Sequence, residues 1–160
     1  MRLSECLEQE IFDAGMKKRR MELTGSLEGM LVGSTVITDS SLDPLRDNCI
    51  TCHELEHKRT EPKNLMYAPE DLRRKVEAGV NRRTVLRLVP IEALVFLFKS
   101  GARQAEEFAD ALEIDGEFFC RAMELYEGIY GGSCVKNGCV ITFSPFSIER
   151  NAGGCIKKTQ

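Results

Sequence analysis

The chain has 160 residues, of which 42% are hydrophobic and 29% charged, a composition typical of one globular domain with a buried core. Twenty-two basic and 25 acidic residues leave a net charge of −3, which excludes a uniformly basic protein that coats nucleic acid. The sequence has no apolar run near the ~20 residues of a membrane span and no signal-peptide core, so we expect a cytoplasmic protein that does not bind membranes. Its seven cysteines are then expected to be reduced thiols.

The first third of the chain predicts a short helix and a small sheet. Leu3, Leu7 and Ile11 recur at helical spacing, with Ser4 as the expected N-cap of a helix over residues 4–14. The basic run at residues 17–20 is interpreted as a solvated turn. Short β-rich runs between residues 28 and 38, broken by glycine, predict a small antiparallel sheet.

The rest of the chain predicts mainly helices. Asp43 and Pro44 are typical of a helix start, the first as N-cap and the second at the first helical position, and this helix should extend to about residue 58. Further helices are expected over 69–90, 91–99, 102–112 and 116–130, followed by one strand at 139–143. The fold class expected is therefore α+β and mainly helical.

We expect one domain over residues 1–131, in which the sheet and the first long helix fall within 20–90 and a helical part covers 91–131. Residues 132–160 are expected to hold the single strand and an otherwise loose tail. The sequence shows no repeats and no low-complexity linker.

The chemistry of the sequence is concentrated in the first long helix, which contains His53-Glu54-Leu55-Glu56-His57. Residues four apart on a helix lie on one face, so the two imidazoles can take adjacent corners of a tetrahedral Zn²⁺ site. Glu54 is then placed to accept a proton from the metal-bound water. The pattern arises by chance in roughly one in 700 arrangements of these residues, so we interpret it as a catalytic zinc motif.

The chain contains no other histidine, so the third ligand must be a carboxylate or a thiolate. His₂Glu is an established catalytic set with an open fourth position. Glu77 is preferred, because a second helix packed across the first could aim it at the metal. Glu70 and Asp71 are the competitors, and Glu61 lies too close to the end of the first helix. Asn81, one turn after Glu77, is a candidate hydrogen-bond partner of a ligand.

Cys49 and Cys52 raise two alternative kinds of metal site. Cys49-Ile50-Thr51-Cys52-His53 matches the attachment pattern of c-type haem, which requires an exported protein. A closed zinc site of two cysteines and two histidines is strained, because Cys52 points away from the histidine face on one continuous helix. We therefore expect both cysteines to pack this helix against its neighbours.

The sequence resembles the ImmA/IrrE family of zinc metallopeptidases, in its phage and mobile-element branch, over about residues 5–131. The run from Asn48 to His57 resembles the zinc helix of the family, and Glu77-Ala78-Gly79-Val80-Asn81 followed by Leu88-Val89-Pro90 resembles its second helix. The helical part up to Tyr130-Gly131 is similar to that branch as well. The chain departs from the family pattern at Glu56, where many relatives have glycine, and at Val80 and Thr84, where small residues are usual.

The resemblance implies a cytosolic zinc endopeptidase with a zincin-like fold, in which His53, His57 and Glu77 bind Zn²⁺ and Glu54 is the catalytic base. It also implies a protein substrate, a helix-turn-helix repressor of a phage or mobile element. Tyr67 or Arg73 is a candidate for stabilising the oxyanion. The alternative is a regulator without catalytic activity that binds a protein and uses zinc only for stability.

Charge is distributed unevenly along the chain. Residues 101–130 hold eight acids and two bases, a net charge of −6, so their two helices should not bind DNA directly although their spacing resembles a helix-turn-helix. Residues 58–90 hold nine bases and four acids, a net charge of +5. This segment is either a surface suited to an acidic part of a protein partner or an ordinary set of solvated helix faces.

Overall fold

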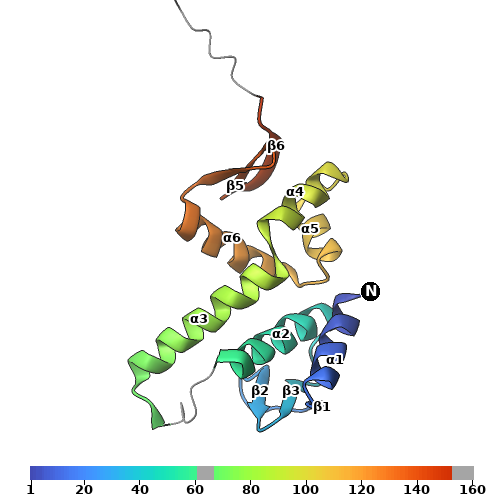
Figure 1. Cartoon of the computed structure of the whole chain (residues 1–160), viewed down its shortest axis with the longest axis vertical. Coiled ribbons are helices and arrows are strands. Elements are labelled where there is room, and N and C mark those ends of the chain that lie inside the picture. The colour runs from blue at the N-terminus through green and yellow to red at the C-terminus, as the bar shows by residue number, and fades with distance from the viewer. Residues whose placement is uncertain (61–66, 153–160) are drawn as a thin grey trace, which may run out of the picture.

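The computed structural model describes residues 1–60 and 67–152, and the chain has an α+β fold. The N-terminal elements are α1 (Leu3–Asp13), β1 (Lys17–Met21), β2 (Gly29–Val32), β3 (Thr35–Asp39) and α2 (Pro44–Thr60). The C-terminal elements are α3 (Glu70–Leu88), α4 (Ile91–Lys99), α5 (Ala105–Ala111), α6 (Gly116–Tyr130), β4 (Ser133–Lys136), β5 (Cys139–Phe143) and β6 (Phe146–Arg150). In Figure 1 the long helix α3 runs from the N-terminal layer toward the C-terminal elements.

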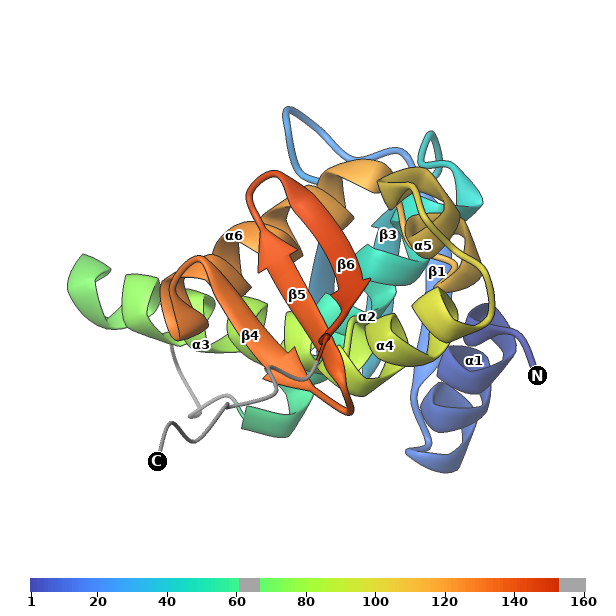
Figure 2. The ribbon, with the colours of Figure 1, turned by 90° about the horizontal axis from the view of Figure 1, so that it is seen from above.

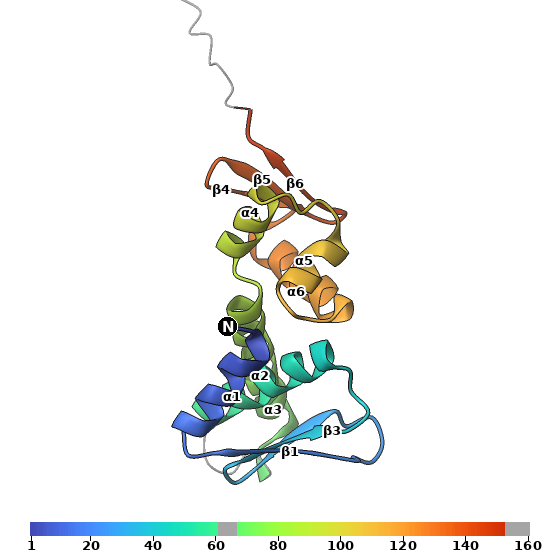
Figure 3. The same cartoon turned by 90° about the vertical axis from the view of Figure 1, so that its right-hand side faces the viewer.

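The N-terminal sheet has the strand order β1-β3-β2 and is mixed. The sheet was expected to be antiparallel; that holds for β2 and β3, whereas β1 pairs with β3 in parallel. The difference arises because β2 and β3 form a hairpin through Gly33, at φ +60°, and β1 joins the far side of β3. Figure 3 shows α1 and α2 on one face of this sheet. In the order β1-β3-β2 the strand β2 lies at an edge, and it packs against α2.

The basic run at residues 17–20 forms β1, so its interpretation as a solvated turn was wrong. Alternate side chains of a strand point to the same side, and here Lys18 and Arg20 both form ion pairs with Asp47 of α2. Asp47 is 7% exposed and also accepts a hydrogen bond of 2.6 Å from Thr38 Oγ1. Two cations and a hydroxyl therefore compensate the buried carboxylate that ties the sheet to α2.

Helix α2 begins as the sequence predicts. Asp43 Oδ1 accepts hydrogen bonds from the backbone N–H groups of Leu45 and Arg46, at 2.9 and 3.1 Å, which is the N-cap expected before Pro44. The prediction for α1 was wrong by two residues: Arg2 is the N-cap in place of Ser4, and its N–H donates to Glu5. The other predicted helices are present at nearly the predicted bounds.

The C-terminal residues form a second sheet, antiparallel and ordered β4-β5-β6. The strand predicted at 139–143 is confirmed, whereas the loose tail predicted around it was wrong up to Arg150; residues 153–160 lie outside the described part of the chain. Asn137 and Gly138 have φ of 49° and 76°, as a tight hairpin turn requires. Alternate β5 side chains, Cys139, Ile141 and Phe143, are buried, and Figure 2 shows this sheet lying over α6 and α4.

The core joins the two sheets and the helices between them into one unit. It includes Leu7 and Val36 from the N-terminal part and Leu94, Phe119 and Ile141 from the C-terminal part. Within the described residues, no helix has the length and apolar character that crossing a membrane requires.

Candidate metal centre

Helix α2 presents both histidines on the side that faces α3. His53 and His57 are one helical turn apart, and their Nε2 atoms lie 3.1 Å from each other, as the i, i+4 spacing predicts. Their side chains are 18% and 14% exposed. Both rings are therefore largely shielded, with one nitrogen of each directed at the same point.

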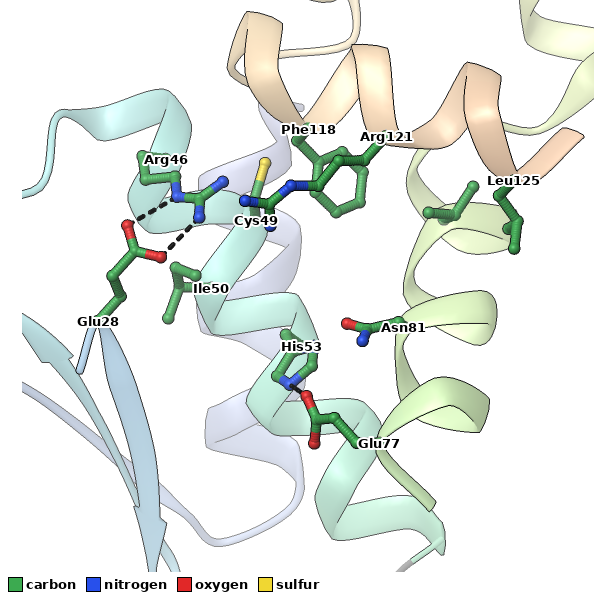
Figure 4. Close-up of a pocket in the computed structure, with 11 residues that line it drawn as sticks. Glu28, Arg46, Cys49, Ile50, His53, Glu77, Asn81, Phe118, Arg121 and Leu125 are labelled. Atoms are coloured by element: carbon green, nitrogen blue, oxygen red, sulfur yellow. Dashed lines mark hydrogen bonds and ion pairs between the residues drawn. The ribbon is translucent and has the colours of Figure 1, made fainter. Parts of the chain in front are cut away.

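Glu77 approaches this point from α3, which packs against α2. Its Oε1 lies 2.9 Å from His53 Nε2 and its Oε2 lies 3.0 Å from His57 Nε2. Figure 4 shows the carboxylate directed at the His53 ring from the neighbouring helix. Across the described residues, these three form the group able to hold a metal ion.

The donor set and its spacing fit a tetrahedral Zn²⁺ site. Ligand atoms about 2.0–2.1 Å from a tetrahedral zinc lie roughly 3.4 Å apart. The two Nε2 atoms lie 3.1 Å apart, and each lies 2.9 or 3.0 Å from one of the two Glu77 oxygens. One ligand atom from each residue lies within 4.8 Å of the other two, so small shifts of the side chains would give the spacing that zinc requires. Three protein ligands leave the fourth position open, as in catalytic rather than closed structural sites.

The electrostatics of the group favour a charged carboxylate. The pKa of Glu77 is held well below its ordinary value, first by the hydrogen bond with His53 and then by that with His57, although burial opposes the shift. An ionised carboxylate beside two imidazoles is the state that binds a divalent cation.

The competing ligands are placed elsewhere. Glu70 is exposed on the first turn of α3, with its Oε1 3.1 Å from Arg74 Nη2, and Asp71 is exposed as well. Glu61 lies outside the described residues. Cys49 and Cys52 are 1% and 0% exposed and pack within the core, as expected for structural thiols.

Glu54 is buried and lies in the same pocket as the three ligand candidates. This pocket is also lined by β2 and the residues before it, from Leu27 to Leu31. Gly29 allows β2 to approach this closely: a Cβ there would lie 2.3 Å from Ile50 Cγ2 and 3.3 Å from Glu54 Oε1. The edge strand therefore borders the carboxylate and the histidines directly.

The remaining predicted site residues differ in their placement. Asn81 lines a second pocket with His53 and Glu77 (Figure 4), and its role as a hydrogen-bond partner of a ligand stays a prediction. Tyr67 is 88% exposed, and neither it nor the exposed Arg73 lines a described pocket with the histidines. The structure gives no support to either residue as an oxyanion partner.

Sequence reasoning missed the charged residues that close this second pocket. Arg46 donates from Nε and Nη2 to Glu28, at 2.9 and 2.5 Å, and its Nη1 lies 3.3 Å from Asp115 Oδ2. These residues are 18 and 69 positions apart from Arg46. No periodic pattern along the sequence signals such a contact.

Three arginines of the basic segment at 58–90 form ion pairs with acidic residues of this protein. Arg59, Arg83 and Arg87 surround Glu56, whose side chain is 5% exposed. Glu10 of α1 forms ion pairs with two of these arginines. The surface of this segment is therefore less basic than its composition predicts.

Comparison of the chain with family models, with curated proteins and with solved structures finds no match. The functional interpretation therefore depends on the geometry of the site and on the resemblance seen in the sequence.

Proposed function

We propose that the protein is a zinc-dependent endopeptidase of the ImmA/IrrE type with a zincin-like arrangement of strand and metal helix. One observation carries the proposal: His53, His57 and Glu77 converge within 3.1 Å of one another from two helices, with Glu54 in the same pocket. This is the His₂Glu donor set of gluzincins together with the glutamate that their chemistry needs.

Each residue has a separate role in this proposal. His53, His57 and Glu77 would hold the ion, and the low pKa of Glu77 keeps that carboxylate ionised. When bound, Zn²⁺ polarises a peptide carbonyl and lowers the pKa of water. Glu54 would accept a proton from the attacking water at its carboxylate and deliver it to the leaving amine.

The edge strand β2 supports a peptide as the substrate. One side of β2 pairs with β3, so the other side offers backbone groups to an extended segment, a common mode of peptide recognition. Residues of β2 and the two residues before it line the pocket that contains Glu54 and the histidines. A peptide bound along β2 would therefore pass close to His53, His57 and Glu77.

The substrate that the family resemblance implies is a helix-turn-helix repressor of a phage or mobile element, and the site would act in the cytoplasm. No part of this proposal requires contact with nucleic acid or a membrane. The acidic helices α5 and α6 support this view, because a surface that reads DNA is basic.

The test combines metal content with one isosteric variant. Purified protein should contain one zinc per chain, and Glu77→Ala should lose it while Glu70→Ala keeps it. Glu54→Gln should keep zinc and fold but reduce cleavage of casein or a candidate repressor by about 10²–10⁴-fold, the usual contribution of a general base. Loss of zinc in Glu70→Ala but not in Glu77→Ala would contradict the ligand set.

The alternative is a non-catalytic regulator that binds a protein and is stabilised by zinc. It predicts that Glu54→Gln retains full biological activity and that the wild type cleaves neither protein. Cleavage abolished by Glu54→Gln, with zinc and fold retained, would exclude it.

A further inference from the structure

A cavity of about 380 Å³ lies beside His53, between α2, α3 and α6. Figure 4 shows its lining residues extending from His53 and Glu77 toward Arg46, near the N-terminal end of α2. Glu28, Ile50, His53 and Glu77 also line the pocket along β2. The two pockets therefore adjoin at His53 and Glu77.

The walls of this cavity are largely apolar. Ile50 comes from α2, Val85 from α3, and Phe118 and Leu125 from α6. The volume is at the lower end of the ~300–1,000 Å³ of ligand pockets, which suits one side chain rather than a large cofactor.

The charged groups at the far end of the cavity are already paired. The Arg46 side chain is 12% exposed, and its guanidinium is shared between Glu28 and Asp115. Arg121, at the rim, is 58% exposed and forms an ion pair with Glu117. A charged side chain entering the cavity would thus lose its hydration without gaining a free partner, which is costly.

We propose that this cavity is the subsite that selects the substrate, and that it takes a bulky uncharged side chain of a residue next to the scissile bond. The inference rests on the proposed function for its peptide ligand. Three observations support the subsite: the cavity lies beside His53, its walls are largely apolar, and the charged groups at its end are paired.

The test measures binding rather than cleavage, so that it does not depend on catalysis. The probes are N-acetylated amino-acid hydroxamates, whose hydroxamate binds zinc and whose side chain samples the cavity. Binding to the zinc-loaded protein is measured by titration calorimetry for the glycine, alanine, leucine, phenylalanine, aspartate and lysine compounds. Leucine and phenylalanine should bind at least about tenfold more tightly than glycine, aspartate and lysine, since each methylene in an apolar pocket is worth about tenfold or more.

Two variants locate the effect in the cavity. Phe118→Ala removes a wall and should weaken leucine binding by about tenfold, whereas Leu125→Phe narrows the cavity and should weaken phenylalanine more than alanine. The matched control is Phe96→Ala on α4, whose ring is 69% exposed and does not line the cavity; it should bind all compounds like the wild type. Circular dichroism and zinc content check that each variant is folded.

The outcomes separate this inference from the proposed function. Selective hydroxamate binding that the α6 variants alter, without any cleavage, would support the subsite and reject catalysis. Cleavage combined with equal binding of all side chains, or with a preference for aspartate or lysine, would overturn the subsite while leaving catalysis in place. Equal effects of Phe118→Ala and Phe96→Ala would overturn it too.

Discussion

The buried carboxylate of Glu56 gives a prediction about what holds α2 against α3. Its Oε1 lies 3.2 Å from Arg87 Nη1 and 3.3 Å from Arg59 Nη1, and its Oε2 lies 3.7 Å from Arg83 Nε. Glu10 pairs with two of the same arginines. Glu56 and Glu10 therefore link α1, α2 and α3 through these arginines.

Removing the charge with Glu56→Gln should lower the free energy of unfolding by about 2–3 kcal/mol. Breaking a buried ion pair costs about 3–5 kcal/mol. The lower value is expected because glutamine still accepts a hydrogen bond and the arginine side chains are 26–54% exposed, where solvent screens them. At about 2–4 °C per kcal/mol for a chain of this size, Tm should fall by about 4–12 °C.

The assay is thermal and urea denaturation in EDTA, so that metal binding does not contribute to stability. Glu124→Gln, an exposed glutamate on α6, is the matched control and should change stability by no more than about 0.5 kcal/mol. A double-mutant cycle with Arg87→Met should show coupling of at least about 0.5 kcal/mol. Equal losses in Glu56→Gln and Glu124→Gln, or no coupling with Arg87, would refute the reasoning.

Three further predictions concern other parts of the fold. Gly29→Ala should lower stability by about 1–3 kcal/mol through overpacking, because its Cβ would meet Ile50 Cγ2 at 2.3 Å; denaturation should show the loss, and a second change, Ile50→Ala, should relieve it. Cys52 should react with a thiol reagent far more slowly than the exposed Cys120, because burial raises its pKa to about 12; equal rates would contradict this. Tyr126→Phe should cost about 1 kcal/mol at neutral pH, since the hydroxyl donates to a backbone oxygen at 2.6 Å. Burial raises the pKa of Tyr126 to about 12 from 10, so the advantage of the wild type over Tyr126→Phe should be complete below pH 10 and decline as pH rises toward 12. An advantage that stays constant from pH 8 to 12 would contradict that assignment.

Local features of the sequence were enough to predict helix α2, which carries both histidines. Asp43 and Pro44 fix its start through a side-chain cap and a preset backbone angle, and the four-residue spacing places His53 and His57 on one face. These relations act within one or two helical turns, so they depend little on the rest of the chain. The hairpin turn at Asn137–Gly138 is a local signal of the same kind, and missing it led to the wrong prediction of a loose tail.

The tertiary structure decided everything that joins distant residues. The spacing of 20 residues between His57 and Glu77 allowed several third ligands, and only the crossing of α3 over α2 brings Glu77 within 3.0 Å of His57. The approach of the N-terminal end of α6 to α2 joins Arg46 to Asp115, at one end of the cavity beside His53. By itself, the sequence determined the two histidines, the glutamate between them and the helix that carries all three. The third ligand candidate, Glu77, and the cavity beside His53 depend on how separate elements pack, and local propensities do not encode that packing.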